Sequence, residues 1–134
     1  MSDDTIRKID IASDFDVLSS RKIVREECQR IGYSITDITR IVTAASELAR
    51  NIFLYAGKGT MELKRVEREG IIGIELIFED EGPGIEDFES GMENGFENYN
   101  GMGLGLRGAK RLMDEMEIKS EIGKGTIISV MKWL

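Results

Sequence analysis

Two polar residues near the middle of the chain, Glu47 and Asn51, stand four positions apart in a segment with helical periodicity. Residues four apart project from the same side of a helix, so the carboxylate and the amide are expected to lie one above the other. Together they could hold a metal ion or a water molecule. Charged and amide side chains occur on the solvent-exposed side of most amphipathic helices. On spacing alone, this pair is therefore more often part of a solvated helix face than of a binding site.

A second group of interest is the run from Asp80 to Gly84, which directly follows a predicted strand. Gly82 and Gly84 permit positive φ and a close approach of the backbone, and Pro83 stiffens the turn between them. A buried Asp80 could accept a hydrogen bond from a ligand amine while the backbone closes over a ring. A simple turn that ends a strand explains the pattern about equally well.

Three alternate glycines, Gly101, Gly103 and Gly105, precede a predicted helix. Free N–H groups at the start of a helix, together with its positive dipole end, favour phosphate binding. The spacing differs from the dinucleotide fingerprint, and the Gly-Lys-Ser or Gly-Lys-Thr of a Walker loop is missing, so both of those sites are disfavoured.

The segment between Gly82 and Leu106 contains no Lys or Arg. If it covers a triphosphate, the negative charge must be met by Mg²⁺, by backbone amides, or by Arg107 and Lys110 beyond it. Losing a cationic clamp costs phosphoryl transfer on the order of a thousandfold in rate. The sequence therefore favours slow chemistry, which a single-turnover switch tolerates.

The composition argues against several other activities. Histidine is absent, which excludes Ser-His-Asp and Cys-His catalysis and histidine phosphotransfer onto this chain. Cys28 is the single cysteine, so no internal disulfide is expected and a packing role is favoured. A net charge of −7 disfavours nucleic acid and anionic membranes as partners. Short apolar runs and an acidic amino terminus predict a cytoplasmic protein.

The elements that must position these groups follow from apolar periodicity and from capping residues, and the length fits one domain over residues 1–134. The predicted helices run from an N-cap at Ser13 to about Ile31 before the stop Gly32, from Thr36 to Ala56, and from Leu104 to Met116. The inward stripe predicted for the first helix comprises Val17, Leu18, Val24, Cys28 and Ile31.

Strands are predicted at Thr5–Ile11, Met61–Glu67, Ile71–Asp80, Ile118–Ile122 and Thr126–Trp133. Each predicted helix has one apolar stripe, and the sheet needs one covered face. The fold class is therefore α+β, a two-layer α/β sandwich of a mixed, mostly antiparallel sheet with helices on one face. The glycine-rich segment is expected at the edge of the sandwich.

Taken together and in order, four motifs resemble those of the GHKL ATPase/kinase superfamily. They are Glu47 through Asn51, Asp80 through Gly84, Gly101 through Gly105, and Gly125-Thr126. The resemblance covers nearly the whole chain and implies a Bergerat ATP-binding fold with ATP and Mg²⁺ as cofactors. It implies Glu47 as the general base and Asn51 as the Mg²⁺ ligand. Asp80 would recognise the adenine amine, Gly82 and Gly84 would line the base, Gly101, Gly103 and Gly105 would close on the phosphates, and Thr126 would support the adenine pocket.

Within that superfamily the chain is most similar to the switch serine/threonine kinases of the bacterial stressosome. The similarity is carried by Ser46–Ile52, Leu54–Gly59, Lys110–Glu115 and the ending Lys132–Leu134. It implies STAS-domain substrates, RsbS-like and RsbR-like, and an RsbU-like phosphatase that the released kinase activates by binding. In the related anti-sigma kinases an arginine precedes the third motif, whereas Asn98-Tyr99-Asn100 stands there in this chain.

Two other functions stay open on the sequence. One is an anti-sigma factor kinase of the RsbW/SpoIIAB type that sequesters a sigma factor. The other is a nucleotide-binding adaptor without catalysis, favoured by the missing cations and by the acidic residues between Glu86 and Glu97, although such runs are most often merely solvated.

Overall fold

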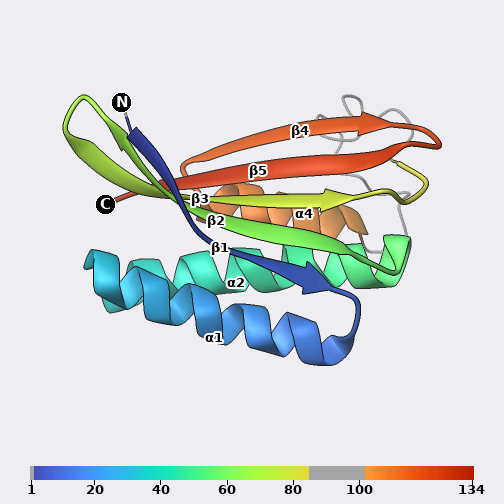
Figure 1. Cartoon of the computed structure of the whole chain (residues 1–134), viewed down its shortest axis with the longest axis horizontal. Coiled ribbons are helices and arrows are strands. Elements are labelled where there is room, and N and C mark those ends of the chain that lie inside the picture. Colours follow the sequence, from blue (N-terminus) through green and yellow to red (C-terminus); the bar gives the residue numbers. More distant parts are fainter. Residues whose placement is uncertain (1, 85–101) are drawn as a thin grey trace.

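The computed structural model describes residues 2–84 and 102–134. In chain order the elements are β1 (Ser2–Ile11), α1 (Asp14–Ile31), α2 (Ile35–Asn51), the π-helix η1 (Ile52–Ala56), β2 (Gly59–Arg68), β3 (Ile71–Asp80), α4 (Met102–Leu112), β4 (Glu115–Glu121) and β5 (Gly125–Trp133). Figure 1 shows the strands stacked as one layer, with α1 and α2 beneath them. The α+β two-layer architecture predicted from the sequence is confirmed.

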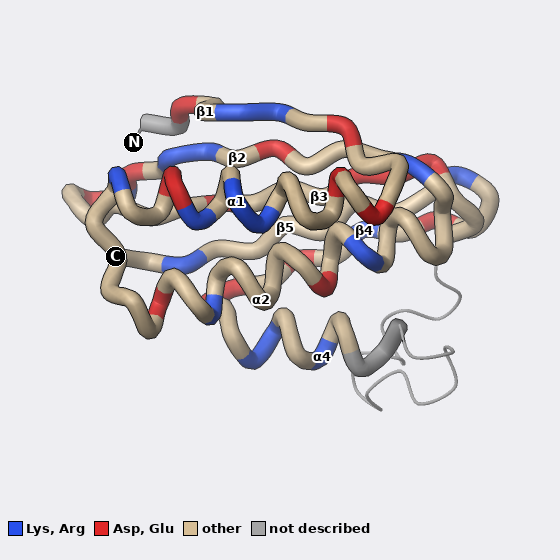
Figure 2. Tube along the Cα trace, turned by 90° about the horizontal axis from the view of Figure 1, so that it is seen from below, with Lys and Arg blue, Asp and Glu red and all other residues tan. Residues whose placement is uncertain are grey.

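The sheet has five strands in the order β1-β2-β3-β5-β4. Each of the four pairings between described strands is antiparallel, so the expectation of a mixed sheet narrows to an antiparallel one. Helices α1, α2 and α4 lie side by side along one face (Figure 2), and α2 packs against both of the others. In the described ranges, no helix is long and apolar enough to cross a membrane.

The first two helices begin at serine caps. Ser13 accepts a hydrogen bond from the Asp16 N–H at 3.1 Å, and Gly32 ends α1 in the left-handed region at φ 108°, as the sequence predicts. Ser34 caps α2 in the same way through the Asp37 N–H, so this helix begins at Ile35, one residue before the predicted start.

The long second helix predicted to reach Ala56 differs from the observed one in its last turn. The α-helical part ends at Asn51, and residues Ile52–Ala56 form the π-helix η1. A π turn widens the helix by one residue and is frequent at functional sites. Gly57 then ends the segment with φ 83° and returns the chain towards β2.

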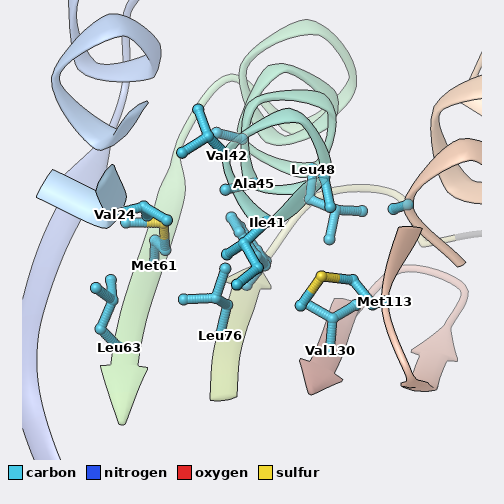
Figure 3. Packing of buried hydrophobic residues seen from close by; sticks show 14 of the residues in the cluster. Val24, Ile41, Val42, Ala45, Leu48, Met61, Leu63, Leu76, Met113 and Val130 are labelled. Atoms are coloured by element: carbon cyan, nitrogen blue, oxygen red, sulfur yellow. The ribbon is translucent and has the colours of Figure 1, made fainter. Parts of the chain in front are cut away.

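The core lies between the helix layer and the inner face of the sheet. Figure 3 shows Val24 of α1 and Ile41 and Leu48 of α2 above side chains from the strands, among them Leu63 and Val130. All five are buried and belong to one apolar cluster. Because these contacts fix α2 against β2, β3 and β5, the core holds Glu47 and Asn51 in place relative to the sheet.

Two predictions within the helices are wrong. Leu18, predicted on the inward stripe of α1, is 59% exposed, because the helix turns its Val17 side to the sheet. The third helix ends at Leu112 instead of Met116, and Met116 lies in β4. Met113 and Met116 still contact the core, so their apolar character fits either continuation.

Candidate functional site

A pocket of about 120 Å³ opens where the end of α2 and η1 face the ends of β3 and β5. Asn51 and Asp80 both line it, one from the helix layer and the other from the sheet. Thr126 and Gly84 line it as well. The remaining wall is largely apolar and consists of Leu48, Ile52, Tyr55, Ala56, Phe78, Pro83 and Ile128. An apolar slot with a few convergent polar groups is the usual form of a small-molecule site.

Asp80 is the last residue of β3 and pairs directly with Thr126 of β5. The Gly82 N–H donates to Asp80 Oδ1 at 2.9 Å, and the Thr126 N–H donates to the same carboxylate. Burial nevertheless raises the pKa of Asp80, because the loss of hydration outweighs those two hydrogen bonds, and the neighbouring Glu79 adds to the rise. The pocket therefore holds an acceptor that is incompletely stabilised and available to a ligand donor.

Glycines allow the backbone to close around this carboxylate. A Cβ on Gly82 would lie 2.5 Å from the Ala56 Cβ, and one on Gly125 would lie 2.0 Å from the Asp80 carbonyl oxygen. Gly84 has φ 79°, and a Cβ there would lie 2.5 Å from the Glu121 carbonyl oxygen. The run from Asp80 to Gly84 is therefore packed more closely than a simple turn requires, since a side chain on Gly82 would collide with Ala56 and one on Gly84 with the backbone at Glu121.

Glu47 and Asn51 meet Gly105 of α4 across the helix interface. A Cβ built on Gly105 would lie 3.2 Å from Glu47 Oε2 and 3.3 Å from Asn51 Nδ2. Among the described residues, Asn51 Nδ2 is buried and has no hydrogen-bond partner. Such an orphaned group is costly unless something else binds it. Glu47 is half-exposed and pairs with Arg50 at 3.2 Å, so its carboxylate stays reachable from solvent.

The other site residues predicted from the sequence divide into two groups. Gly101 lies outside the described residues, as do Asn98-Tyr99-Asn100 and the acidic run. Gly103 lies inside the first turn of α4, which begins at Met102, so the glycines do not all precede the helix as expected. Arg107 and Lys110 are exposed on the same helix. Figure 2 shows the basic residues along α4.

Sequence reasoning missed the apolar lining of the pocket, including Ile52, Phe78 and Ile128. In the sequence these residues have the pattern of ordinary core residues. Only the pocket that they line in the folded protein distinguishes them from the rest of the core. Tyr55 and Ala56 could have been suspected from their place at the end of the long apolar helix.

Cys28 is a packing residue. Its side chain is fully buried in the core cluster, and burial raises the pKa of the thiol to about 12, with a further contribution from the adjacent Glu27. A thiol with that pKa carries almost no thiolate at neutral pH, and the thiolate is the nucleophilic form.

The antiparallel sandwich and its pocket, walled by a helix end, a strand-terminal aspartate and close-packed glycines, define a nucleotide-binding domain of the ATPase type. The family described as Histidine kinase-like ATPase domain matches residues 13–132, and the chain belongs to that family.

Individual relatives agree with this assignment. The serine/threonine-protein kinase RsbT of Bacillus subtilis (strain 168) is 46% identical over 124 residues, 92% of this chain and 93% of that protein. An anti-sigma F factor of Caldanaerobacter subterraneus subsp. tengcongensis is 31% identical over 121 residues, 86% of this chain and 83% of that protein. In the SiaB–SiaC complex of Pseudomonas aeruginosa, one chain superposes with a TM-score of 0.62 over 97% of this chain and 91% of its own length. At 14% identity that likeness supports the fold alone.

Proposed function

We propose that this protein is an ATP-dependent serine/threonine protein kinase that acts in a partner-switching module of the bacterial stress response. The observation that carries the proposal is the convergence of Asn51, Asp80 and Thr126 on one pocket, with Glu47 beside it at the α2–α4 contact. The 46% identity to RsbT supports the same function.

Adenine recognition follows from the sheet side of the pocket. The carboxylate of Asp80 accepts from the 6-amine of the base, and the apolar wall formed by Leu48, Phe78 and Ile128 contacts the ring. Gly82 leaves room for the base, because a Cβ there would lie 2.5 Å from the Cβ of Ala56, which lines the slot, and Gly84 lines the slot itself. Gly103 and Gly105 lie near the start of α4, where free N–H groups favour anions, and the phosphates bind there in this proposal.

The residues around Gly105 fit a Mg²⁺ ion. Mg²⁺ takes oxygen ligands and is usually held by one or two protein groups plus substrate phosphates. The orphaned amide of Asn51 supplies such a ligand through its oxygen, because the two ends of an amide group are interchangeable by a flip of the side chain. Bound Mg²⁺ would offset the charge of the triphosphate.

Glu47 is the general base in this proposal. It accepts the proton of a partner's serine or threonine hydroxyl as the hydroxyl oxygen forms a bond to the γ-phosphorus, while the bond from that phosphorus to the bridging oxygen breaks and ADP leaves. Arg50 forms an exposed ion pair with the Glu47 carboxylate at 3.2 Å. Because the described pocket carries no lysine or arginine in its lining, we expect slow turnover.

The partners we propose are STAS-domain proteins of the RsbS and RsbR type as substrates, and an RsbU-like phosphatase that the released kinase activates by binding. Cytoplasmic location follows, since such partners and ATP are found there.

The test is incubation of the purified protein with Mg-ATP and a candidate STAS protein, followed by mass measurement of both chains. Transfer adds one phosphoryl group to the partner and none to the kinase. If ATP binds but no phosphate reaches any partner, the protein is a nucleotide-binding adaptor.

A second candidate function is supported by the 31% identity to an anti-sigma F factor. In that case the protein would sequester a sigma subunit, and phosphorylation would serve to release it. Pull-down of a sigma factor, with no retention of STAS or phosphatase partners, would favour this function.

A further inference from the structure

Lys132 of β5 binds the C-terminal end of α4. Its ammonium donates to the carbonyl oxygen of Leu112, the last residue of the helix, at 3.3 Å and to Asp114 Oδ1 at 3.2 Å. The Trp133 N–H donates to the other carboxylate oxygen of Asp114 at 2.8 Å. Both segments belong to the stretches that are similar to the switch kinases, and the lining of the nucleotide pocket includes neither of them.

The same ammonium lies against the start of α2. Its nitrogen is 4.0 Å from an oxygen of Asp37, in the first turn of that helix, and the Lys132 side chain is only 12% exposed. A lysine beside the last carbonyl groups of a helix stabilises the helix by hydrogen bonding and through the helix dipole. An ammonium has three N–H donors. One side chain of β5 therefore holds the end of α4 close to the start of α2.

The helices α2 and α4 run antiparallel, so each end of α4 meets the opposite end of α2. Gly105 lies near the start of α4 and faces Asn51, the last residue of α2. Leu112 ends α4 at the Lys132 contact, beside Asp37. Figure 2 shows the two helices next to each other. Seven residues separate Gly105 from Leu112, which is about 10 Å along a helix, so the lysine contact and the pocket lie at the two ends of one short helix.

We infer that Lys132 is a positioning residue for the nucleotide site: it fixes the position of α4 along α2 and thereby sets the contact between Gly105 and Asn51. This inference rests on the proposed function. The apolar contacts of α4 with the core are non-directional, whereas the contacts of the Lys132 ammonium depend on where the helix ends. A Cβ on Gly105 would lie 3.3 Å from Asn51 Nδ2. A shift of about 1–2 Å between the helices therefore changes the space in which Mg-ATP is proposed to bind.

Lys132→Met removes the ammonium and keeps a long, unbranched side chain. Mg-ATP must then supply the ordering of α4 that the ammonium supplies in the wild type, and this weakens the apparent affinity. We expect Mg-ATP to bind about three- to tenfold more weakly, a loss equivalent to one hydrogen bond of ordinary strength. Isothermal titration calorimetry of the wild type and the variant measures this change.

Amide hydrogen exchange reports on α4 directly. Without nucleotide, the amides around Leu112 should exchange faster in Lys132→Met than in the wild type, because the last turn of the helix opens more readily. Saturating Mg-ATP should reduce this difference, since bound nucleotide holds α4 from its other end. Exchange in β1, at the opposite edge of the sheet from β4, should be the same in both proteins. Identical exchange of α4 in the two proteins would contradict the inference.

Tyr33→Phe is the matched control. The Tyr33 side chain is buried, and its hydroxyl donates to the Lys132 carbonyl oxygen at 2.6 Å. Phenylalanine removes a hydrogen bond to the same residue without releasing the ammonium from α4. The control should lower the denaturant midpoint of unfolding but leave Mg-ATP affinity unchanged. Equal losses of Mg-ATP affinity in Tyr33→Phe and Lys132→Met would indicate a general loosening of the fold and would overturn the role of Lys132.

Asp114→Ala tests the same contact from the other side, and it keeps the test available if Lys132→Met does not fold. Asp114 is exposed, and its carboxylate holds the Lys132 ammonium. The variant should weaken Mg-ATP binding by no more than Lys132→Met does, and the double variant should show little further loss, because both changes act through one contact.

The outcomes separate the inference from the proposed function. Unchanged Mg-ATP affinity in both Lys132→Met and Asp114→Ala, or losses that add in full in the double variant, would overturn the positioning role alone. A wild-type protein that binds no Mg-ATP would instead overturn the proposed function, and the inference with it.

Discussion

Gly105 of α4 lies directly against Asn51 of α2: a Cβ added to the glycine would sit 3.3 Å from the buried Asn51 Nδ2, with Glu47 Oε2 at 3.2 Å. An added Cβ at these distances would be in tighter contact than is usual, so the two side chains would have to shift to admit it. Among the described residues, Asn51 Nδ2 is the buried side-chain nitrogen that lacks a hydrogen-bond partner, and it faces this space. A cation or phosphate that binds between the helices here would need the space that a side chain at position 105 would occupy.

Replacing that glycine should damage nucleotide binding more than folding. We expect Gly105→Ala to weaken Mg-ATP binding about five- to a hundredfold, the range that overpacking of a fitted site produces. Gly108→Ala is the control on the same helix, since a Cβ there would meet nothing within 4 Å. It should keep ATP affinity and raise the free energy of unfolding by about 0.5–1 kcal/mol through helix propensity. Equal ATP affinity in both variants would contradict this arrangement.

Glu47→Gln separates chemistry from binding. The glutamine cannot accept the hydroxyl proton, so phosphate transfer to the partner should fall by about a hundredfold or more, while ATP affinity stays within about twofold. Arg50→Ala removes the 3.2 Å ion pair but leaves the carboxylate, and a pair this exposed contributes little. Its transfer rate should therefore stay close to that of the wild type. Undiminished transfer in Glu47→Gln would show that another group is the base.

Much of this framework could be predicted from the sequence, because capping and periodicity are local signals. Ser13 and Gly32 delimit α1 as expected, and the hairpin turns at Glu69 and Gly70, both with positive φ. The π-helix was not predictable, because the apolar pattern up to Ala56 suits an α-turn as well as a π-turn. The predicted end of α4 is wrong for a similar reason, because Met116 fits the apolar period of a helix as well as that of a strand.

For the site, sequence motifs predicted which polar residues to consider, and the fold places Asn51 and Asp80 in one pocket. The roles of the site residues stay predictions, which the variants described here test.

The raised pKa of Asp80 predicts that pH acts in opposite directions on folding stability and on ATP affinity. Burial raises the pKa of this carboxyl above its unfolded value. The folded state therefore holds the proton more tightly than the unfolded state. The contribution of Asp80 to stability is full below the unfolded pKa and is lost as pH rises through the folded pKa. In the proposed function the ionised Asp80 carboxylate accepts from the base, so ATP affinity should fall on acidification, at a pH above that at which an ordinary aspartate titrates.

Asp80→Asn tests both effects in one variant. It removes the buried charge, so the nucleotide-free protein should melt at neutral pH at the same temperature as the wild type or above it. ATP affinity should drop about tenfold or more, because the charged acceptor for the base is gone. Glu79 directly precedes Asp80 and is exposed, so Glu79→Gln should leave ATP affinity nearly unchanged. A large fall in melting temperature for Asp80→Asn would mean that the carboxylate is a net structural contributor.

Gly125 affects both the shape of the pocket and the stability of the sheet. It has φ 115°, and a Cβ there would lie 2.0 Å from the Asp80 carbonyl oxygen, a backbone atom that cannot turn away. Gly123, in the same β4–β5 turn, has φ 80° with nothing within 4 Å. At both positions alanine would have to adopt an unfavourable positive φ, but only at Gly125 would its Cβ also collide with another atom.

We expect Gly123→Ala to lower the free energy of unfolding by about 1–2 kcal/mol and Gly125→Ala to lower it by at least about 2 kcal/mol more. Denaturant titration measures both values. The second variant must also move β5 away from β3, which separates Thr126 from Asp80. Its ATP affinity should therefore fall even under conditions where the protein is fully folded, whereas Gly123→Ala should bind ATP normally. Equal destabilisation by the two alanines would show that β5 can shift without loss, and that the pairing of Asp80 with Thr126 does not limit the shape of the pocket.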